Sequence, residues 1–244
     1  MLNLRLLATA ALTVSLVGAG VFAEQNPPAA QTPQVPTGRT GRGGYPLPTL
    51  PAVFETLQHK VRVSIVAQGI DRPWSLLILP DGDMLVSVRN TNEVRAIRKG
   101  VLDPKPVAGL PAMRRMFDIV MHPSYSENKW IYFSYSKPGD GRTPIALARG
   151  RYDGTALSNV QDLYTSDPTT PSASRMSFAP DGTIYMTVSG AAGRVAAGPQ
   201  GPELDPRKPN TAYGKVIRLR DDGSVPPDNP FVGASLARVA RSIP

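Results

Sequence analysis

The segment Ser174 to Gly190, SRMSFAPDGTIYMTVSG, decides the fold, because it combines a short apolar strand, a Pro-Asp-Gly turn and a second strand with alternating apolar residues. A near copy, WSLLILPDGDMLVSV, occurs earlier in the chain at Trp74 to Val88. An Asp-Gly pair between two alternating apolar segments is a strong signal for a β-hairpin. A hairpin that recurs in this way indicates a chain built from stacked β units.

The chain is rich in turn-forming residues and has no cysteine. Its 244 residues include 26 Pro and 22 Gly, which favours short strands and many turns over long helices. The absence of cysteine excludes disulfides, a cysteine nucleophile and a thiolate metal site. The net charge is +8, but the basic residues are scattered and form no nucleic-acid-binding motif, so we expect no nucleic-acid partner. An anionic small ligand among arginines is compatible with this charge.

The N-terminal region predicts export. Residues 1–23 have a basic residue, an apolar segment and small residues before Glu24, as a Sec signal peptide requires. We therefore expect a periplasmic or secreted protein without stable membrane insertion after cleavage, and an uncleaved membrane anchor is the alternative. Residues 24–52 are rich in Pro and Gly and predict a disordered linker. The folded domain is then residues 53–244.

Further segments in this domain have the alternation or the apolar character of strands. The expected strands, besides the two arms of each hairpin, are residues 61–70, 93–99, 117–121, 130–136, 145–152, 160–165 and 215–220. Residues 61–99 should form one four-stranded unit, and residues 107–116 and 122–129 should be a loop and a turn. Sets of four strands are typical of the blades of an all-β propeller rather than of a sandwich. At about 40–50 residues per blade, the domain holds about three to four blades.

Four segments, in this order, resemble the soluble PQQ-dependent sugar dehydrogenases, which are the glucose/sorbosone dehydrogenase family of six-bladed propellers. The segments are Arg72 to Arg89, Phe117 to Ser136, Phe178 to Val188 and Tyr213 to Gly233. The last of them, YGKVIRLRDDGSVPPDNPFVG, is the most specific. The resemblance covers roughly residues 60–233 and implies a C-terminally truncated and divergent member of the family.

The resemblance also implies a site that binds PQQ and calcium on one face of the propeller. In the family a histidine takes a proton from the sugar while hydride passes to the quinone. The position of this histidine falls on Pro171 and that of its supporting aspartate on Gly190, so we identify no catalytic residue. Arg175 matches a family arginine, and Arg114 and Arg115 occupy a loop where they could hold an anion or simply face solvent. We predict Arg115 and Arg175 as cofactor-binding residues and assign no metal ligand.

Other residues could bind a metal, act as a base or contact a sugar, but each also has a structural explanation. Asp221, Asp222 and Asp228 could bind calcium, although a DDG sequence more often forms a plain turn. His59, in a likely linker, and His122, in a turn, are expected to be structural rather than general bases. The two tryptophans of the chain are expected to pack between blades rather than to stack on sugars.

The function expected from the resemblance is that of an exported quinoprotein-type sugar dehydrogenase. It would oxidise an aldose or related alcohol with PQQ as electron acceptor, and its partner would be that small molecule, while the final electron acceptor stays unspecified. Since the family's histidine is missing, the alternative is a catalytically degenerate propeller that binds carbohydrate or protein. A third possibility is a calcium-dependent, lactonase-like hydrolase.

Overall fold

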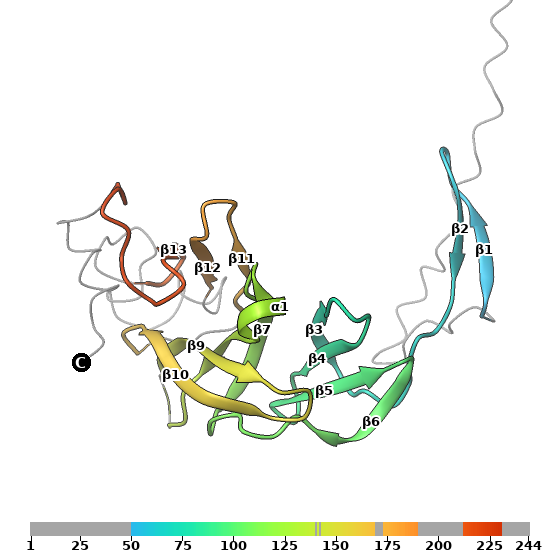
Figure 1. Ribbon diagram of the computed structural model, residues 1–244, viewed down its shortest axis with the longest axis horizontal. Coiled ribbons are helices and arrows are strands. Elements are labelled where there is room, and N and C mark those ends of the chain that lie inside the picture. The colour runs from blue at the N-terminus through green and yellow to red at the C-terminus, as the bar shows by residue number, and fades with distance from the viewer. Residues whose placement is uncertain (1–49, 140, 142, 169–172, 190–211, 231–244) are drawn as a thin grey trace, which may run out of the picture. The chain divides into compact units, whose positions relative to one another are not determined.

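The computed structural model describes residues 50–139, 141, 143–168, 173–189 and 212–230 (Figure 1). Two four-stranded antiparallel sheets, a three-stranded sheet and a separate hairpin are formed by these residues. The predicted signal peptide, Pro171 and Gly190 lie outside them. In the described part of the chain, no helix is long and apolar enough to cross a membrane.

Each of the three larger sheets is a meander in which consecutive strands are neighbours (Figure 1). The first blade consists of β3 (Pro73–Ile78), β4 (Met84–Val88), β5 (Glu93–Arg98) and β6 (Val101–Pro106). The second consists of β7 (Arg115–Met121), β8 (Trp130–Ser136), β9 (Ile145–Tyr152) and β10 (Leu157–Thr165). The third consists of β11 (Met176–Phe178), β12 (Ile184–Val188) and β13 (Lys215–Leu219). The predicted all-β, blade-like organisation is therefore confirmed.

The prediction for residues 61–70 is wrong in its detail. Only β2 (Lys60–Val63) is a strand, and it pairs with β1 (Ala52–Glu55) instead of joining the first blade. The fourth strand of that blade is β6. The sequence did not predict this strand, because β6 contains two prolines. Proline is tolerated there, since β6 is an edge strand of its sheet.

Two smaller boundaries also differ from expectation. The loop predicted for residues 107–116 ends two residues early, because Arg115 already begins β7. The turn predicted for residues 122–129 contains the short helix α1 (Tyr125–Asn128), which ends at Lys129 in a left-handed conformation.

The core of the domain lies between the blades. One apolar cluster joins the first and second blades and includes Leu85, Ile131 and Phe133. A second cluster joins the second and third blades and includes Tyr132 and Ile184. Because successive side chains of a strand point to opposite faces, β8 contributes to both clusters, and the second blade is buried on both sides. This explains the nearly continuous apolar sequence of β8, WIYFSYS.

A close backbone contact also ties the first blade to the second. After β6 the chain runs beside the β9–β10 turn, where the amide of Leu157 donates to the carbonyl of Ala108 at 2.8 Å. Gly109 follows with φ +81°, and a Cβ atom there would lie 2.0 Å from the carbonyl oxygen of Leu157. Only glycine allows the two segments to approach this closely.

Burial raises the pKa of five tyrosines, and that of Tyr125 rises to about 12; the five are Tyr125, Tyr132, Tyr135, Tyr152 and Tyr164. Ionisation of these groups is therefore harder in the folded state than in the unfolded state, where the pKa is about 10. Their contribution to stability is complete below pH 10 and is lost as the pH rises above 10 through the raised pKa values of the folded state. We expect tyrosinate absorbance to appear together with the loss of the far-ultraviolet circular dichroism signal.

The variant Tyr164→Phe tests this expectation. Its hydroxyl is buried and has no hydrogen-bond partner among the described residues, so its removal should shift the alkaline unfolding midpoint to higher pH. Tyrosinate formation that is complete while the dichroism signal remains folded would contradict the prediction.

Candidate anion-binding site

Three edge strands, one from each blade, bring basic residues together. Strand β7 lies against both β3 and β11, and each of the three is the first strand of its sheet. Trp74 and Arg115 lie at the starts of β3 and β7, and Arg175 directly precedes β11. Together with Arg89, which follows β4, and Arg114, these residues form the candidate site. We call the four arginines the rim arginines.

Asp118 holds this end of the three blades together. Its side chain is buried at the centre of β7. It accepts hydrogen bonds from Ser75 Oγ of the first blade at 2.5 Å and from the backbone amide of Met176 of the third blade at 2.6 Å. Arg175 completes the set with an ion pair of 3.1 Å from Nη1 to Asp118 Oδ1. A buried carboxylate is stable only with partners of this kind.

The same ion pair fixes the direction of Arg175. A second nitrogen, Nη2, donates to the backbone carbonyl of Trp74 at 3.0 Å. Its guanidinium carbon lies 5.5 Å from the centre of the Trp74 ring, and that of Arg89 lies 4.3 Å from it. The indole therefore holds two cations in place through cation–π attraction.

Arg115 is the rim arginine best placed to receive an anion. Burial lowers the pKa of its guanidinium, and the neighbouring charges of Arg89 and Arg114 lower it further. Within the described residues its side chain makes neither a hydrogen bond nor an ion pair. Arg114 differs, because its Nη1 donates to the carbonyl of Gly141 at 2.6 Å. Partly buried, crowded cations without a carboxylate partner favour the binding of an anion.

Two buried polar atoms at the same end of the strands support a ligand site. Trp74 Nε1 and Ser174 Oγ are inaccessible to solvent and have no hydrogen-bond partner in the described part of the chain. Buried polar groups normally have a partner. The residues thus offer an aromatic ring, the cationic donors of Arg115 and two further polar groups, which suits a flat ligand that carries carboxylates. Such a donor set fits PQQ.

The structure brings together Arg115 and Arg175, the two residues that the sequence predicted as cofactor-binding. It adds Trp74, which was expected only to pack, and Asp118, which was overlooked. The signal for Asp118 was present in the sequence, since a single acidic residue interrupts the apolar strand FDIVM.

The residues that were considered as metal ligands or bases have structural roles. The carbonyl of Asp221 accepts from Tyr132 Oη at 2.9 Å, Asp222 accepts from the amide of Ser224 at 2.8 Å, and Asp228 pairs with Arg218 at 3.0 Å. No group of His and acidic residues that could hold a metal ion occurs among the described residues.

The histidines are likewise explained by local structure. His122 Nδ1 accepts from the amide of Ser124 at 3.0 Å, and Nε2 lies 3.6 Å from Asp221 Oδ2. The ring also packs edge-on against Phe178 of the third blade. His59 lies in the exposed turn between β1 and β2, where its amide donates to Thr56 Oγ1. The described site therefore contains no histidine.

Antiparallel sheets of this kind, arranged as consecutive blades, define the class as a β-propeller. The family model described as Glucose / Sorbosone dehydrogenase matches residues 70–241, and the chain belongs to this family. It is 31% identical to the aldose sugar dehydrogenase YliI of Escherichia coli, over 79% of this chain and 53% of the relative. It is 26% identical to the quinoprotein glucose dehydrogenase B of Acinetobacter calcoaceticus, over 72% and 42%.

Solved structures agree with this assignment. The soluble aldose sugar dehydrogenase of Escherichia coli matches with a TM-score of 0.58 and 25% identity, over 68% of this chain and 49% of that one. The PQQ-bound aldose sugar dehydrogenase of Streptomyces coelicolor shares the fold with a TM-score of 0.55 and 24% identity, over 70% and 51%. The chain thus spans about half the length of the relatives that it matches.

Proposed function

We propose that the rim arginines bind the carboxylates of PQQ, and that the chain serves in an exported, quinoprotein-type sugar dehydrogenase that oxidises an aldose or related alcohol. The observation that carries this proposal is Arg115, a partly buried guanidinium without an anionic partner among the described residues, beside two further arginines. The names of the relatives support it, since they are sugar dehydrogenases and one is a quinoprotein. When bound, PQQ supplies an electrophilic quinone that accepts hydride.

The residues of the chain have distinct parts in this proposal. Arg115 supplies a charge-assisted donor whose pairing with a carboxylate also relieves the repulsion from Arg89 and Arg114. Arg175 is held in one orientation by Asp118 and by the carbonyl of Trp74, so it loses little conformational freedom when it binds a ligand. Trp74 offers Nε1 as a further donor.

Catalysis and calcium rest on the family resemblance alone. The described site offers no histidine as a base, and the described residues offer no metal cluster. Export to the periplasm or the medium rests on the signal-like residues 1–23. Since positions 171 and 190 are Pro and Gly, the second candidate function is a degenerate propeller that binds its ligand without turnover.

Equilibrium dialysis with PQQ tests the binding step. We expect Arg115→Gln to raise the Kd at least about tenfold, because one charge-assisted hydrogen bond contributes about 1.5–3 kcal/mol. The matched control is Arg62→Gln, on the separate β1–β2 hairpin, which should leave the Kd unchanged. Absence of PQQ binding to the unchanged protein, or equal affinity of the two variants, would refute the proposal.

A dye-reduction assay with PQQ, calcium and a panel of aldoses then distinguishes the two candidate functions. PQQ-dependent dye reduction supports the dehydrogenase. PQQ binding that depends on Arg115 but gives no reduction with any aldose supports the degenerate propeller.

A further inference from the structure

A pocket lies between the first and second blades, at the opposite ends of the strands from the rim arginines. Its walls come from the β3–β4 turn, the end of β5, helix α1 and the β9–β10 turn, and its volume is about 200 Å³. Strands β3 and β7 begin at the rim arginines, whereas the pocket follows their last residues, Ile78 and Met121. The two sites are therefore separate. We call this one the inter-blade pocket.

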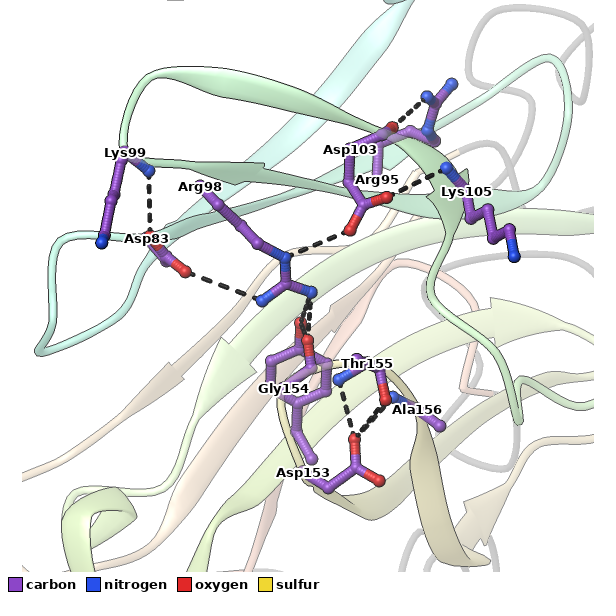
Figure 2. A network of polar contacts seen from close by, with 11 residues as sticks. Asp83, Arg95, Arg98, Lys99, Asp103, Lys105, Asp153, Gly154, Thr155 and Ala156 are labelled. Atoms are coloured by element: carbon purple, nitrogen blue, oxygen red, sulfur yellow. Dashed lines mark hydrogen bonds and ion pairs between the residues drawn. The ribbon is translucent and has the colours of Figure 1, made fainter.

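Arg98 forms a rigid wall of the inter-blade pocket. Figure 2 shows its guanidinium between Asp83, Asp103 and the β9–β10 turn. Nε donates to Asp103 at 3.1 Å, Nη1 lies 3.7 Å from Asp83, and Nη2 donates to Tyr152 Oη at 3.4 Å and to the carbonyl of Gly154. Because its donors already have partners in three elements, Arg98 shapes the pocket without needing a ligand.

Four other groups on the pocket wall have unused hydrogen-bonding capacity. Asp81 and Asp153 each use one carboxylate oxygen to hold their own turn, which leaves the other oxygen as an acceptor. Within the described residues, the hydroxyl of Ser126 makes no hydrogen bond, and the ammonium of Lys129 only lies over the ring of Tyr125, at 5.2 Å. Donors and acceptors thus line the same cavity.

These groups restrict the class of ligand. Two free carboxylates beside one ammonium repel an anion such as PQQ, and the described residues form no metal-binding cluster. A hydroxylated molecule both donates and accepts, and the rings of Tyr125 and Tyr152 add apolar surface. A volume of about 200 Å³ equals about seven waters at ~30 Å³ each, which suits one pyranose ring with its hydroxyls.

We propose that the inter-blade pocket binds one neutral pyranose unit, independently of the rim arginines and of any oxidation there. The ammonium of Lys129 and the hydroxyl of Ser126 donate to ring substituents, and the free oxygens of Asp81 and Asp153 accept from sugar hydroxyls. This proposal does not depend on PQQ binding or sugar oxidation at the rim arginines.

Saturation-transfer difference NMR with methyl α-D-glucopyranoside and methyl α-D-galactopyranoside tests the proposal. These glycosides lack the free anomeric hydroxyl of an aldose, so binding is measured apart from its oxidation. We expect saturable transfer from the full chain with a Kd on the order of 1–10 mM. The double variant Ser126→Ala/Lys129→Gln should weaken binding at least about fivefold, since it removes two donors.

Two controls make the result specific. The first control, Lys99→Gln, removes an exposed lysine that has a left-handed conformation like Lys129 but does not line the pocket. The second control, Arg115→Gln, alters the rim arginines. Neither variant should change the Kd for the glycosides. Circular dichroism establishes that each variant is folded. Absence of saturable transfer to either glycoside, or equal affinity of the double variant and the unchanged chain, would overturn the proposal. Loss of glycoside binding in Arg115→Gln alone would overturn it as well, because the sugar would then bind at the rim.

Discussion

Replacement of Asp118 by alanine is expected to lower the free energy of unfolding by about 3 kcal/mol, because it leaves two buried donors without an acceptor at about 1–3 kcal/mol each. These donors are the hydroxyl of Ser75 and the amide of Met176, in the first and third blades. The Arg175 side chain adds little to the loss, since it is 57% exposed and water can replace its partner. Urea unfolding followed by circular dichroism measures the change.

Two further variants identify the cause of that loss. Asp118→Asn keeps an acceptor for one donor and should lie between alanine and the unchanged chain. Asp71→Asn changes an exposed aspartate that accepts from Asn90 at 2.5 Å, and its effect should stay within about 0.5 kcal/mol. If Asp118→Ala were as stable as Asp71→Asn, the carboxylate would not join the blades.

The variant Gly109→Ala should be about equally damaging, with a loss of roughly 3 kcal/mol. Its Cβ would lie 2.0 Å from the backbone oxygen of Leu157, and backbone atoms cannot turn aside as a flexible side chain can. The first blade must then move away from the β9–β10 turn, which weakens the hydrogen bond between Leu157 and Ala108.

Gly100→Ala is the matched control for this clash. Its φ of +80° nearly equals the +81° of Gly109, but a Cβ atom at Gly100 would have no neighbour within 4 Å. The free energy of unfolding of Gly100→Ala should therefore fall by only about 1–2 kcal/mol, the cost of the left-handed conformation for a residue with a Cβ atom. Urea midpoints of the two variants that agree within error would show that conformational strain, and not the backbone contact, controls both.

The blades were predictable because their determinants are local. The Pro-Asp-Gly turns and the apolar alternation of β4 and β12 are visible in a few consecutive residues. Strand β6 was not predictable in this way, since Pro104 and Pro106 are acceptable only on an unpaired edge, and an edge is a property of the complete sheet.

The candidate site was predictable only in part for the same reason. Arg175 was found because it matches a family arginine, and Arg115 because two adjacent arginines in a loop can hold an anion. The structural role of Asp118 depends on its contacts with Ser75 and Arg175, which lie 43 and 57 positions away along the chain. Sequence alone does not show that three blades meet at this residue. The inter-blade pocket likewise combines turns from two blades, so no single sequence motif predicts it.

The position of Trp74 also supplies an intrinsic optical reporter for the rim arginines. The chain has two tryptophans, and the other, Trp130, lies on the second blade with the guanidinium of Arg149 4.5 Å from its ring. In a Trp130→Phe protein, indole emission would come from Trp74 alone. Because two guanidinium groups lie over its ring, its emission wavelength and intensity should respond when an anion neutralises them. Ligand occupancy could then be followed in real time without a label.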